Sequence, residues 1–142
     1  MSTPLLEHYG LELLEAELSP DDQLRRQVRE LLGGLYPEGP FERRHEQRYP
    51  YPKLIQLMPT NSDGSVTLGS KIVVSGKQIS EHGLSFFHPQ PLPYRLVVAV
   101  LESIDRTKHG FLLDLDWCRF TQLGWYESGG KFLRAVELKQ AA

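Results

Sequence analysis

The first part of the chain, residues 4–32, carries hydrophobic residues at helical spacing. One stripe consists of Leu5, Leu6, Tyr9 and Leu13, and a second stripe consists of Leu24, Val28, Leu31 and Leu32. The residues between the stripes suit a helix start, because Ser19 can cap free amides and Pro20 fits a first turn. Gly33 and Gly34 supply a helix end, since glycine adopts the left-handed conformation readily. The pattern therefore predicts two helices.

From residue 53 onward the pattern changes to short runs rich in Val, Ile, Leu and Phe, which are typical of strands. The runs cover residues 53–58, 65–79, 83–88, 94–102, 110–121 and 131–139. Residues typical of turns separate them at 61–64, 89–91, 105–110 and 128–130. Several short strands without helices between them indicate an antiparallel barrel or sandwich. We therefore predict a mainly β protein with an N-terminal α-helical extension.

Residues 35–52 join the two patterns and contain prolines at positions 37, 40, 50 and 52. Proline denies the backbone both a helix interior and a central strand, so this stretch is predicted to be a loop. The loop carries Arg43, Arg44 and Arg48. The chain thus divides into a helical extension at 1–34, an arginine-bearing loop at 35–52 and a β-barrel at 53–142.

The chain has 142 residues, of which 40% are hydrophobic and 24% are charged, and this composition fits one soluble domain. No apolar run approaches the roughly 20 residues of a membrane span, and the N-terminus lacks the features of a secretory signal. We expect a cytoplasmic protein with no membrane span. The one cysteine, Cys118, excludes an intramolecular disulfide, and we expect it to be buried beside Trp117.

The arginines of the loop stand out because the whole chain has a net charge of -2. This balance lacks the uncompensated Lys and Arg of a general DNA- or RNA-binding protein, so we expect no nucleic-acid partner. The charge balance does not argue against a small anionic ligand that is bound at one local site. The planar guanidinium of arginine fits phosphate oxygens in a two-point contact and can also bind or stack on guanine. The alternative is that these arginines form ion pairs with Glu42 and Glu46 on a solvated loop and bind no ligand.

Two motifs, in order along the chain, carry the most information about function. Arg44 and Arg48 form an RxxxR motif, and the segment from Gln78 through Ser80 to Gly83 forms a QxSxxG motif about one strand pair later. Together they resemble the PilZ family, bacterial receptor domains for the second messenger cyclic di-GMP. The signature of that family is an RxxxR motif followed by a DxSxxG or NxSxxG motif. The resemblance extends from the arginine loop onward and leaves the N-terminal helices outside.

This resemblance implies a six-stranded antiparallel barrel that binds cyclic di-GMP on its outer surface and has no catalytic activity. By the same resemblance, Arg44 and Arg48 contact the phosphates and guanines of the ligand, and Ser80 hydrogen-bonds a guanine. Gly83 is expected to allow a tight turn at positive φ, which glycine adopts without a Cβ penalty. Arg43 resembles the arginine of family members that take up a stacked ligand dimer.

Gln78 departs from the family, which has Asp or Asn at this position. Its amide lies one methylene further from the backbone and accepts hydrogen bonds less strongly than a carboxylate, so we expect weaker binding. In a working receptor, ligand binding would order the arginine loop and reorient residues 1–40 toward a protein partner, in signal transduction. The alternative is a degenerate PilZ adaptor that binds no nucleotide and uses its amphipathic N-terminal helices to dock a partner or to form a homodimer.

The remaining candidate residues favour structural roles. The five histidines lack the spacing of metal ligands, so we expect no metal and no cofactor. Ser80, Glu81 and His82 lack a nucleophile elbow, which argues against an enzyme, and His82 is expected to be an exposed turn residue. Asp114 and Asp116 are expected on the solvated face of a strand. Aromatic residues could stack on single-stranded nucleic acid in a barrel of the OB type, but we expect most of them in the core or in packing between neighbouring strands. These aromatic residues are Phe86, Phe87, Trp117, Trp125, Tyr126 and Phe132.

Overall fold

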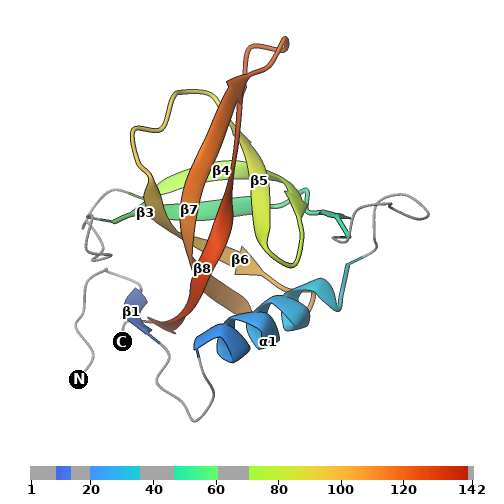
Figure 1. The fold of residues 1–142 in the computed structure, drawn as a ribbon, viewed down its shortest axis with the longest axis vertical. Coiled ribbons are helices and arrows are strands. Elements are labelled where there is room, and N and C mark those ends of the chain that lie inside the picture. The colour runs from blue at the N-terminus through green and yellow to red at the C-terminus, as the bar shows by residue number, and fades with distance from the viewer. Residues whose placement is uncertain (1–8, 14–19, 36–46, 61–70, 141–142) are drawn as a thin grey trace.

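Six strands close into an antiparallel barrel in the computed structural model, which describes residues 9–13, 20–35, 47–60 and 71–140. In chain order the strands are β3 (Leu54–Pro59), β4 (Ile72–Ile79), β5 (Gly83–His88), β6 (Leu96–Glu102), β7 (Lys108–Phe120) and β8 (Tyr126–Gln140). Around the barrel they follow the order β8-β5-β4-β3-β6-β7, and β7 pairs again with β8 (Figure 1). This arrangement confirms the predicted mainly β fold and the six-stranded barrel.

The barrel closes around a core to which each strand contributes alternate side chains. In β7, Phe111 and Leu113 are fully buried, and the ring of Phe111 lies 4.7 Å from the ring of Phe132 on β8. Leu57 of β3 and Phe86 of β5 are also fully buried. These residues belong to one contiguous cluster. The apolar runs that predict strands in the sequence are therefore the runs that build the core.

Helix α1 (Pro20–Leu32) lies across one end of the barrel (Figure 1). Its Val28 and Leu31 are fully buried in the same cluster as the barrel residues, and the other two residues of the predicted stripe pack partly against it. A polar contact adds to this packing, because Nδ1 of His109 on β7 lies 2.7 Å from the side-chain oxygen of Gln27. The second predicted helix is confirmed, and its apolar stripe covers the barrel.

The first predicted helix is wrong over residues 9–13, and the rest of its range, which includes Leu5 and Leu6, lies outside the described residues. Residues Tyr9–Leu13 form strand β1, which pairs antiparallel with the last residues of β8. Tyr9, Leu11 and Leu13 alternate with a period of two, so the same segment fits a strand as well as a helix. Pairing with the edge of β8 selects the strand over the helix, and β8 is distant from this segment in the sequence.

The last hairpin turn lies earlier than predicted, because residues 128–130 belong to β8. The chain reverses before Tyr126 instead, in a turn that contains Gly124 at φ 86°. The glycines of β8 mark a close contact between strands, since a Cβ at Gly130 would lie 2.2 Å from the carbonyl oxygen of Asp114. Local composition does not distinguish these two uses of glycine.

The other strands agree with the predicted runs, with shifted ends. β7 begins at Lys108, inside the turn that was expected at 105–110. The expected turn at 61–64 and the first part of the second run, 65–70, lie outside the described residues. In the described part of the chain, no helix is long and apolar enough to cross a membrane.

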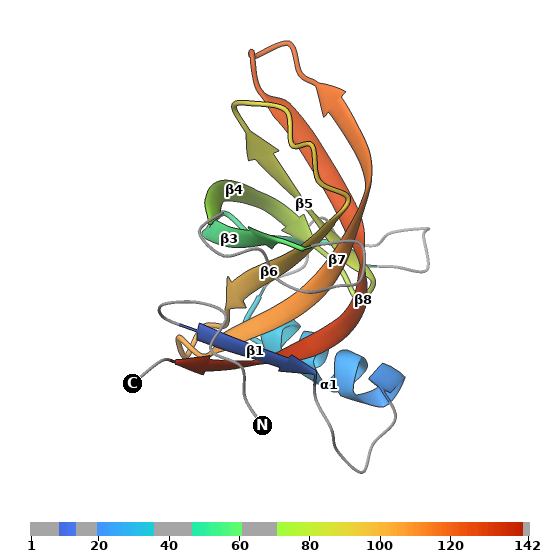
Figure 2. The ribbon, with the colours of Figure 1, turned by 90° about the vertical axis from the view of Figure 1, so that its left-hand side faces the viewer.

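Above the end of β6, the upper part of β7 pairs with β8 alone, whereas β8 also pairs with β5 as far as Tyr126. The turn between β7 and β8 projects from the body of the molecule (Figure 2). Pairing of β7 with β6 ends at Asp114, whereas its pairing with β8 continues to Phe120. Cys118 lies in this upper part and is exposed, so its predicted burial is wrong. The reason is that a strand with one neighbour has too little structure around it to cover its side chains.

Candidate functional site

The second motif lies where β4 turns into β5. Gln78 on β4 is opposite Ser85 on β5. The neighbours of Ser85 on both sides belong to the core, so Ser85 faces the outer surface of the barrel. Ser80 follows the end of β4, and both its N–H and its hydroxyl donate to the carbonyl oxygen of Gly83, at 2.8 and 3.3 Å. The turn therefore fixes the position of Ser80 beside the row that contains Gln78.

Arg48 of the first motif reaches the same place through a short strand. Strand β2 (Tyr49–Pro50) pairs antiparallel with the end of β4, so that Pro50 lies opposite Gln78. The loop expected at 35–52 is therefore wrong at its C-terminal end, where the chain forms a strand. A short strand at the edge of a sheet tolerates proline, because the missing N–H can face away from the partner.

Tyr51 fixes this strand to the barrel. Its side chain is 1% exposed, and its hydroxyl donates to the carbonyl oxygen of Glu102 at 3.1 Å and accepts the N–H of Glu102 at 2.7 Å. Burial raises the pKa of Tyr51, so the hydroxyl stays protonated at neutral pH. Gly76 on β4 makes room for the backbone of Tyr51, since a Cβ at Gly76 would lie 2.4 Å from the carbonyl oxygen of Tyr51. Arg48 is thereby held beside β4.

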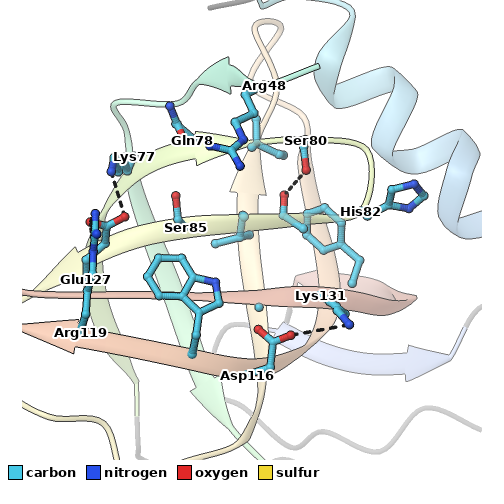
Figure 3. A pocket seen from close by; sticks show the side chains of 16 residues that line it. Arg48, Lys77, Gln78, Ser80, His82, Ser85, Asp116, Arg119, Glu127 and Lys131 are labelled. Atoms are coloured by element: carbon cyan, nitrogen blue, oxygen red, sulfur yellow. Dashed lines mark hydrogen bonds and ion pairs between the residues drawn. The ribbon is translucent and has the colours of Figure 1, made fainter. Parts of the chain in front are cut away.

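These segments line a pocket of about 890 Å³ on the outer surface of β4, β5, β7 and β8 (Figure 3). Of the predicted site residues, four line this pocket: Arg48, Gln78, Ser80 and Gly83. Arg43 and Arg44 lie outside the described residues. The fold thus brings the described residues of both motifs to one place.

Trp117 forms part of the pocket wall and is 42% exposed. It lies opposite Gly129 on β8, where an added Cβ would be 2.4 Å from carbons of the indole. The missing side chain at Gly129 lets the ring lie against the backbone of β8. Phe86 and Phe132 lie in the core, and Trp117 packs across the strands against Gly129, as expected for most of the aromatic residues. A glycine opposite a tryptophan is a signal for such a ring, but it is visible only once the strand register is known.

The pocket is rich in cationic side chains. Its charged lining residues are Arg48, Lys77, Arg119 and Lys131 against Asp116 and Glu127, so the local balance is positive. Glu127 accepts hydrogen bonds from Lys77 at 2.8 Å and from Nη2 of Arg119 at 2.8 Å. Burial raises the pKa of Glu127, but the hydrogen bonds from Lys77 and Arg119 outweigh this effect and lower it. The Glu127 carboxylate therefore stays charged at neutral pH and holds two cations along one side of the pocket (Figure 3).

Gly83 has a different role from the predicted one. Its φ does not lie in the positive region, unlike that of Gly124. Glycine is required here for space, since a Cβ at Gly83 would lie 2.1 Å from the carbonyl oxygen of Gly130 on β8. The same close approach lets the carbonyl oxygen of His82 accept the N–H of Phe132 at 2.8 Å. The side chain of His82 is exposed at the turn, as predicted.

Polar side chains outside the charged lining of the pocket can be compared with known kinds of site by their grouping and burial. Among the described residues, no three His, Cys, Asp or Glu side chains gather so that they could hold a metal ion. A Ser–His pair connects β5 with β8, where Nε2 of His88 lies 2.7 Å from Oγ of Ser128 and Nδ1 lies 2.6 Å from the carbonyl oxygen of Gln90. The carbonyl can only accept, so Nδ1 carries the proton of this hydrogen bond. Both side chains are buried, which makes this pair a structural tie.

Comparison of the chain with protein-family models, with curated proteins and with solved structures found no match. The resemblance to the PilZ family therefore rests on the motif residues themselves. In the described part of the chain these residues are Arg48, Gln78, Ser80 and Gly83, which line one pocket.

Proposed function

We propose that this chain is a non-enzymatic receptor for cyclic di-GMP in the bacterial cytoplasm, and that it relays ligand binding to a partner protein. One observation carries the proposal: Arg48, from the first motif, lines the same surface pocket as Gln78 and Ser80 from the second (Figure 3). The motifs are separate in the sequence, and their meeting supports a ligand that has both phosphates and purine bases.

The charges of the pocket support a small dianion. Cyclic di-GMP carries two phosphate charges, and cationic side chains bind phosphate oxygens through charge-assisted hydrogen bonds. Arg48 and Lys131 line the pocket, and Glu127 holds two further cations beside it. The volume of about 890 Å³ lies within the range of small-molecule sites, about 300–1,000 Å³.

Groups that can recognise guanine lie in the same pocket. The side chain of Gln78 has an amide donor and a carbonyl acceptor, and arginine can bind the acceptor edge of guanine. Trp117, which is 42% exposed, offers a ring on which a base can stack, a contact worth about 1–3 kcal/mol. A carboxylate would accept the N–H groups of guanine more strongly than Gln78 does, so we expect Gln78→Asp to tighten binding.

Isothermal titration calorimetry with cyclic di-GMP tests the proposal, with cyclic di-AMP and GMP as control ligands. Saturable binding is expected for cyclic di-GMP and not for the controls. Arg48→Ala should weaken it by roughly 10- to 100-fold, because a hydrogen bond between charged groups contributes about 1.5–3 kcal/mol. The matched variant is Arg134→Ala, which removes the same charge from an exposed position on β8 outside the pocket. Equal affinities of Arg48→Ala and the parent would contradict the site assignment.

A nucleotide-blind adaptor is the second candidate, and two observations favour it. Gln78 stands where the family has Asp or Asn, and the turn between β7 and β8 exposes an apolar tip. Leu123 is 86% exposed and Trp125 is 46% exposed, which is typical of a surface that contacts another protein. The same titration separates the two candidates. No heat from the parent, with binding restored by Gln78→Asp, would identify an adaptor with a degenerate site, and no heat from either chain would reject the receptor.

A further inference from the structure

The upper part of β7 has an unpaired edge. Within the described residues, pairing with β6 ends at Asp114, and one further hydrogen bond joins the N–H of Leu115 to the carbonyl oxygen of Arg95 at 2.7 Å. Residues 117–120 pair with β8 alone, and Asp116 lies at the shift in register before them. All residues of this segment are exposed: Asp116, Trp117, Cys118, Arg119 and Phe120. Such an edge offers backbone N–H and C=O groups to another strand. We call the side of residues 116–120 that faces away from β8 the hairpin edge.

The hydrogen bond that closes the hairpin shows which residues face this edge. The N–H of Thr121 donates to the carbonyl oxygen of Trp125 at 2.7 Å, so Thr121 directs its N–H toward β8. Backbone groups alternate in direction along a strand, so those of Arg119 also point toward β8. The groups of Cys118 and Phe120 point to the hairpin edge. Cys118 is the central residue of this edge.

We propose that two copies of the chain pair along the hairpin edge, antiparallel and about a twofold axis at Cys118. In this register Cys118 faces Cys118 of the partner subunit, and Trp117 faces Arg119 of the partner subunit. Asp116 faces Phe120 of the partner subunit. No like charges lie opposite each other in this register. The segment is thus complementary to a second copy of itself, as a twofold interface requires.

Neighbouring registers fit less well. An axis at Arg119 sets the guanidinium of one copy opposite that of the other, and the backbone groups of Arg119 point toward β8 and not across the edge. An axis at Trp117 has the same mismatch of backbone groups. An axis at Phe120 places the edge opposite the turn of the partner, where the chain leaves the strand. The axis at Cys118 is the register that pairs the whole edge.

Aromatic contacts connect the hairpin to the barrel before any pairing occurs. The rings of Phe120 and Tyr126 lie 5.1 Å apart in an edge-to-face contact, and Tyr126 stacks on His88 at 5.6 Å. His88 is buried and lies 2.7 Å from the hydroxyl of Ser128. These contacts hold the edge in place, so that pairing orders few additional groups and costs less conformational entropy.

Sedimentation velocity of the nucleotide-free chain in reductant, over a range of concentrations, tests the pairing. The wild-type chain is expected to shift from monomer to dimer as its concentration rises. Phe120→Lys places a charge on the hairpin edge and should raise the dissociation constant at least roughly tenfold. Leu133→Lys is the matched control, because Leu133 is 44% exposed on β8 outside the hairpin, and it should dimerise like the wild type. A wild-type chain that stays monomeric, or a dimer that survives Phe120→Lys, would overturn the proposal.

Cys118 gives an independent readout, because it is the one cysteine of the chain. In a hydrogen-bonded antiparallel pair the Cα atoms are about 5.5 Å apart, within the range that a disulfide spans. Diamide takes up two electrons and two protons as two Cys118 thiols form one disulfide, so a covalent dimer is expected on a non-reducing gel. The control combines Cys118→Ser with Leu123→Cys, since Leu123 is 86% exposed but lies at the hairpin tip, far from its symmetry mate. If the control cross-links as fast as the wild type, collision explains the dimer and the proposed register is wrong.

Discussion

The lower and upper halves of β7 differ in burial, although they belong to one continuous strand. Phe111 and Leu113, in the lower half, are 0% exposed, and β7 there has β6 on one side and β8 on the other. Trp117 and Phe120, in the upper half, are 42% and 64% exposed, and β8 is their one neighbouring strand in the described chain. Residue type does not explain the difference, since both halves carry aromatic side chains. The number of neighbouring strands does.

This difference separates stability from recognition within one pair of strands. In the lower half, aromatic side chains pack into the core, whereas in the upper half they form a pocket wall and the hairpin edge. The change occurs at a shift in register between Leu115 and Trp117, beside Gly129 and Gly130. Substitutions in the lower half should therefore act on folding, and substitutions in the upper half should act on binding or association.

Phe111→Ala tests the lower half and is expected to have the largest effect. Phe111 is fully buried against Phe132, and loss of such a ring lowers the free energy of unfolding by about 3–5 kcal/mol. Phe120→Ala is the matched change in the upper half and should cost about 1 kcal/mol or less, because Phe120 is 64% exposed. Urea unfolding followed by circular dichroism measures both variants. Equal losses would mean that burial along β7 does not determine its contribution to stability.

Gly130→Ala and Gly124→Ala compare the two uses of glycine, and their effects come next in size. A Cβ at Gly130 would lie 2.2 Å from the carbonyl oxygen of Asp114, so the strands must move apart, at a cost of about 3 kcal/mol. At Gly124, with φ 86°, an added Cβ meets nothing within 4 Å, and the backbone conformation alone costs about 1 kcal/mol. Thermal unfolding should rank Gly130→Ala as the less stable variant. The reverse order would rule out the steric account.

These glycines also show where sequence reasoning ends. The barrel is predictable because its strands are short apolar runs between turn residues, and α1 is predictable from its stripe and its start at Pro20. Residues 128–130 look like a turn because adjacent glycines are typical of turns. Residues Tyr9–Leu13 look like a helix because their spacing fits both structures. In each case the deciding contact is with a distant strand, namely the carbonyl of Asp114 for Gly130 and the end of β8 for β1.

The candidate site divides in the same way. The grouping of Arg48, Gln78 and Ser80 is predictable, because these residues belong to two short motifs that can be recognised in the sequence without knowledge of the fold. The cationic cluster on β7 and β8 is not predictable, because it depends on the register that sets Arg119 opposite Glu127. A buried carboxylate between two cations has no local signature, since each of its residues resembles an ordinary charged surface position.

Glu127 is an exception to the comparison, because it is a buried side chain in the upper half, and its replacement should have a smaller effect than Phe111→Ala or Gly130→Ala. Glu127→Gln keeps the shape of the side chain and removes the charge that binds Lys77 and Arg119, each at 2.8 Å. Both partners are partly exposed and can be solvated when the charge is lost. We therefore expect the free energy of unfolding to fall by about 1–2 kcal/mol at pH 7.

The pH dependence of this loss identifies its cause. Burial raises the pKa of Glu127, but the hydrogen bonds from Lys77 and Arg119 lower it below its ordinary value of 4.5. The charge therefore stabilises the folded state above that pH, and its contribution is lost as the pH falls through the lowered pKa. Urea unfolding should show the full difference between parent and Glu127→Gln at pH 7 and almost none at strongly acidic pH. Asp116→Asn is the control, because its carboxylate lies 3.8 Å from Lys131 at the surface and contributes at most about 0.5 kcal/mol. If the loss for Glu127→Gln is the same at both pH values, packing and not charge is responsible, and Glu127 belongs with Phe111 as a core residue.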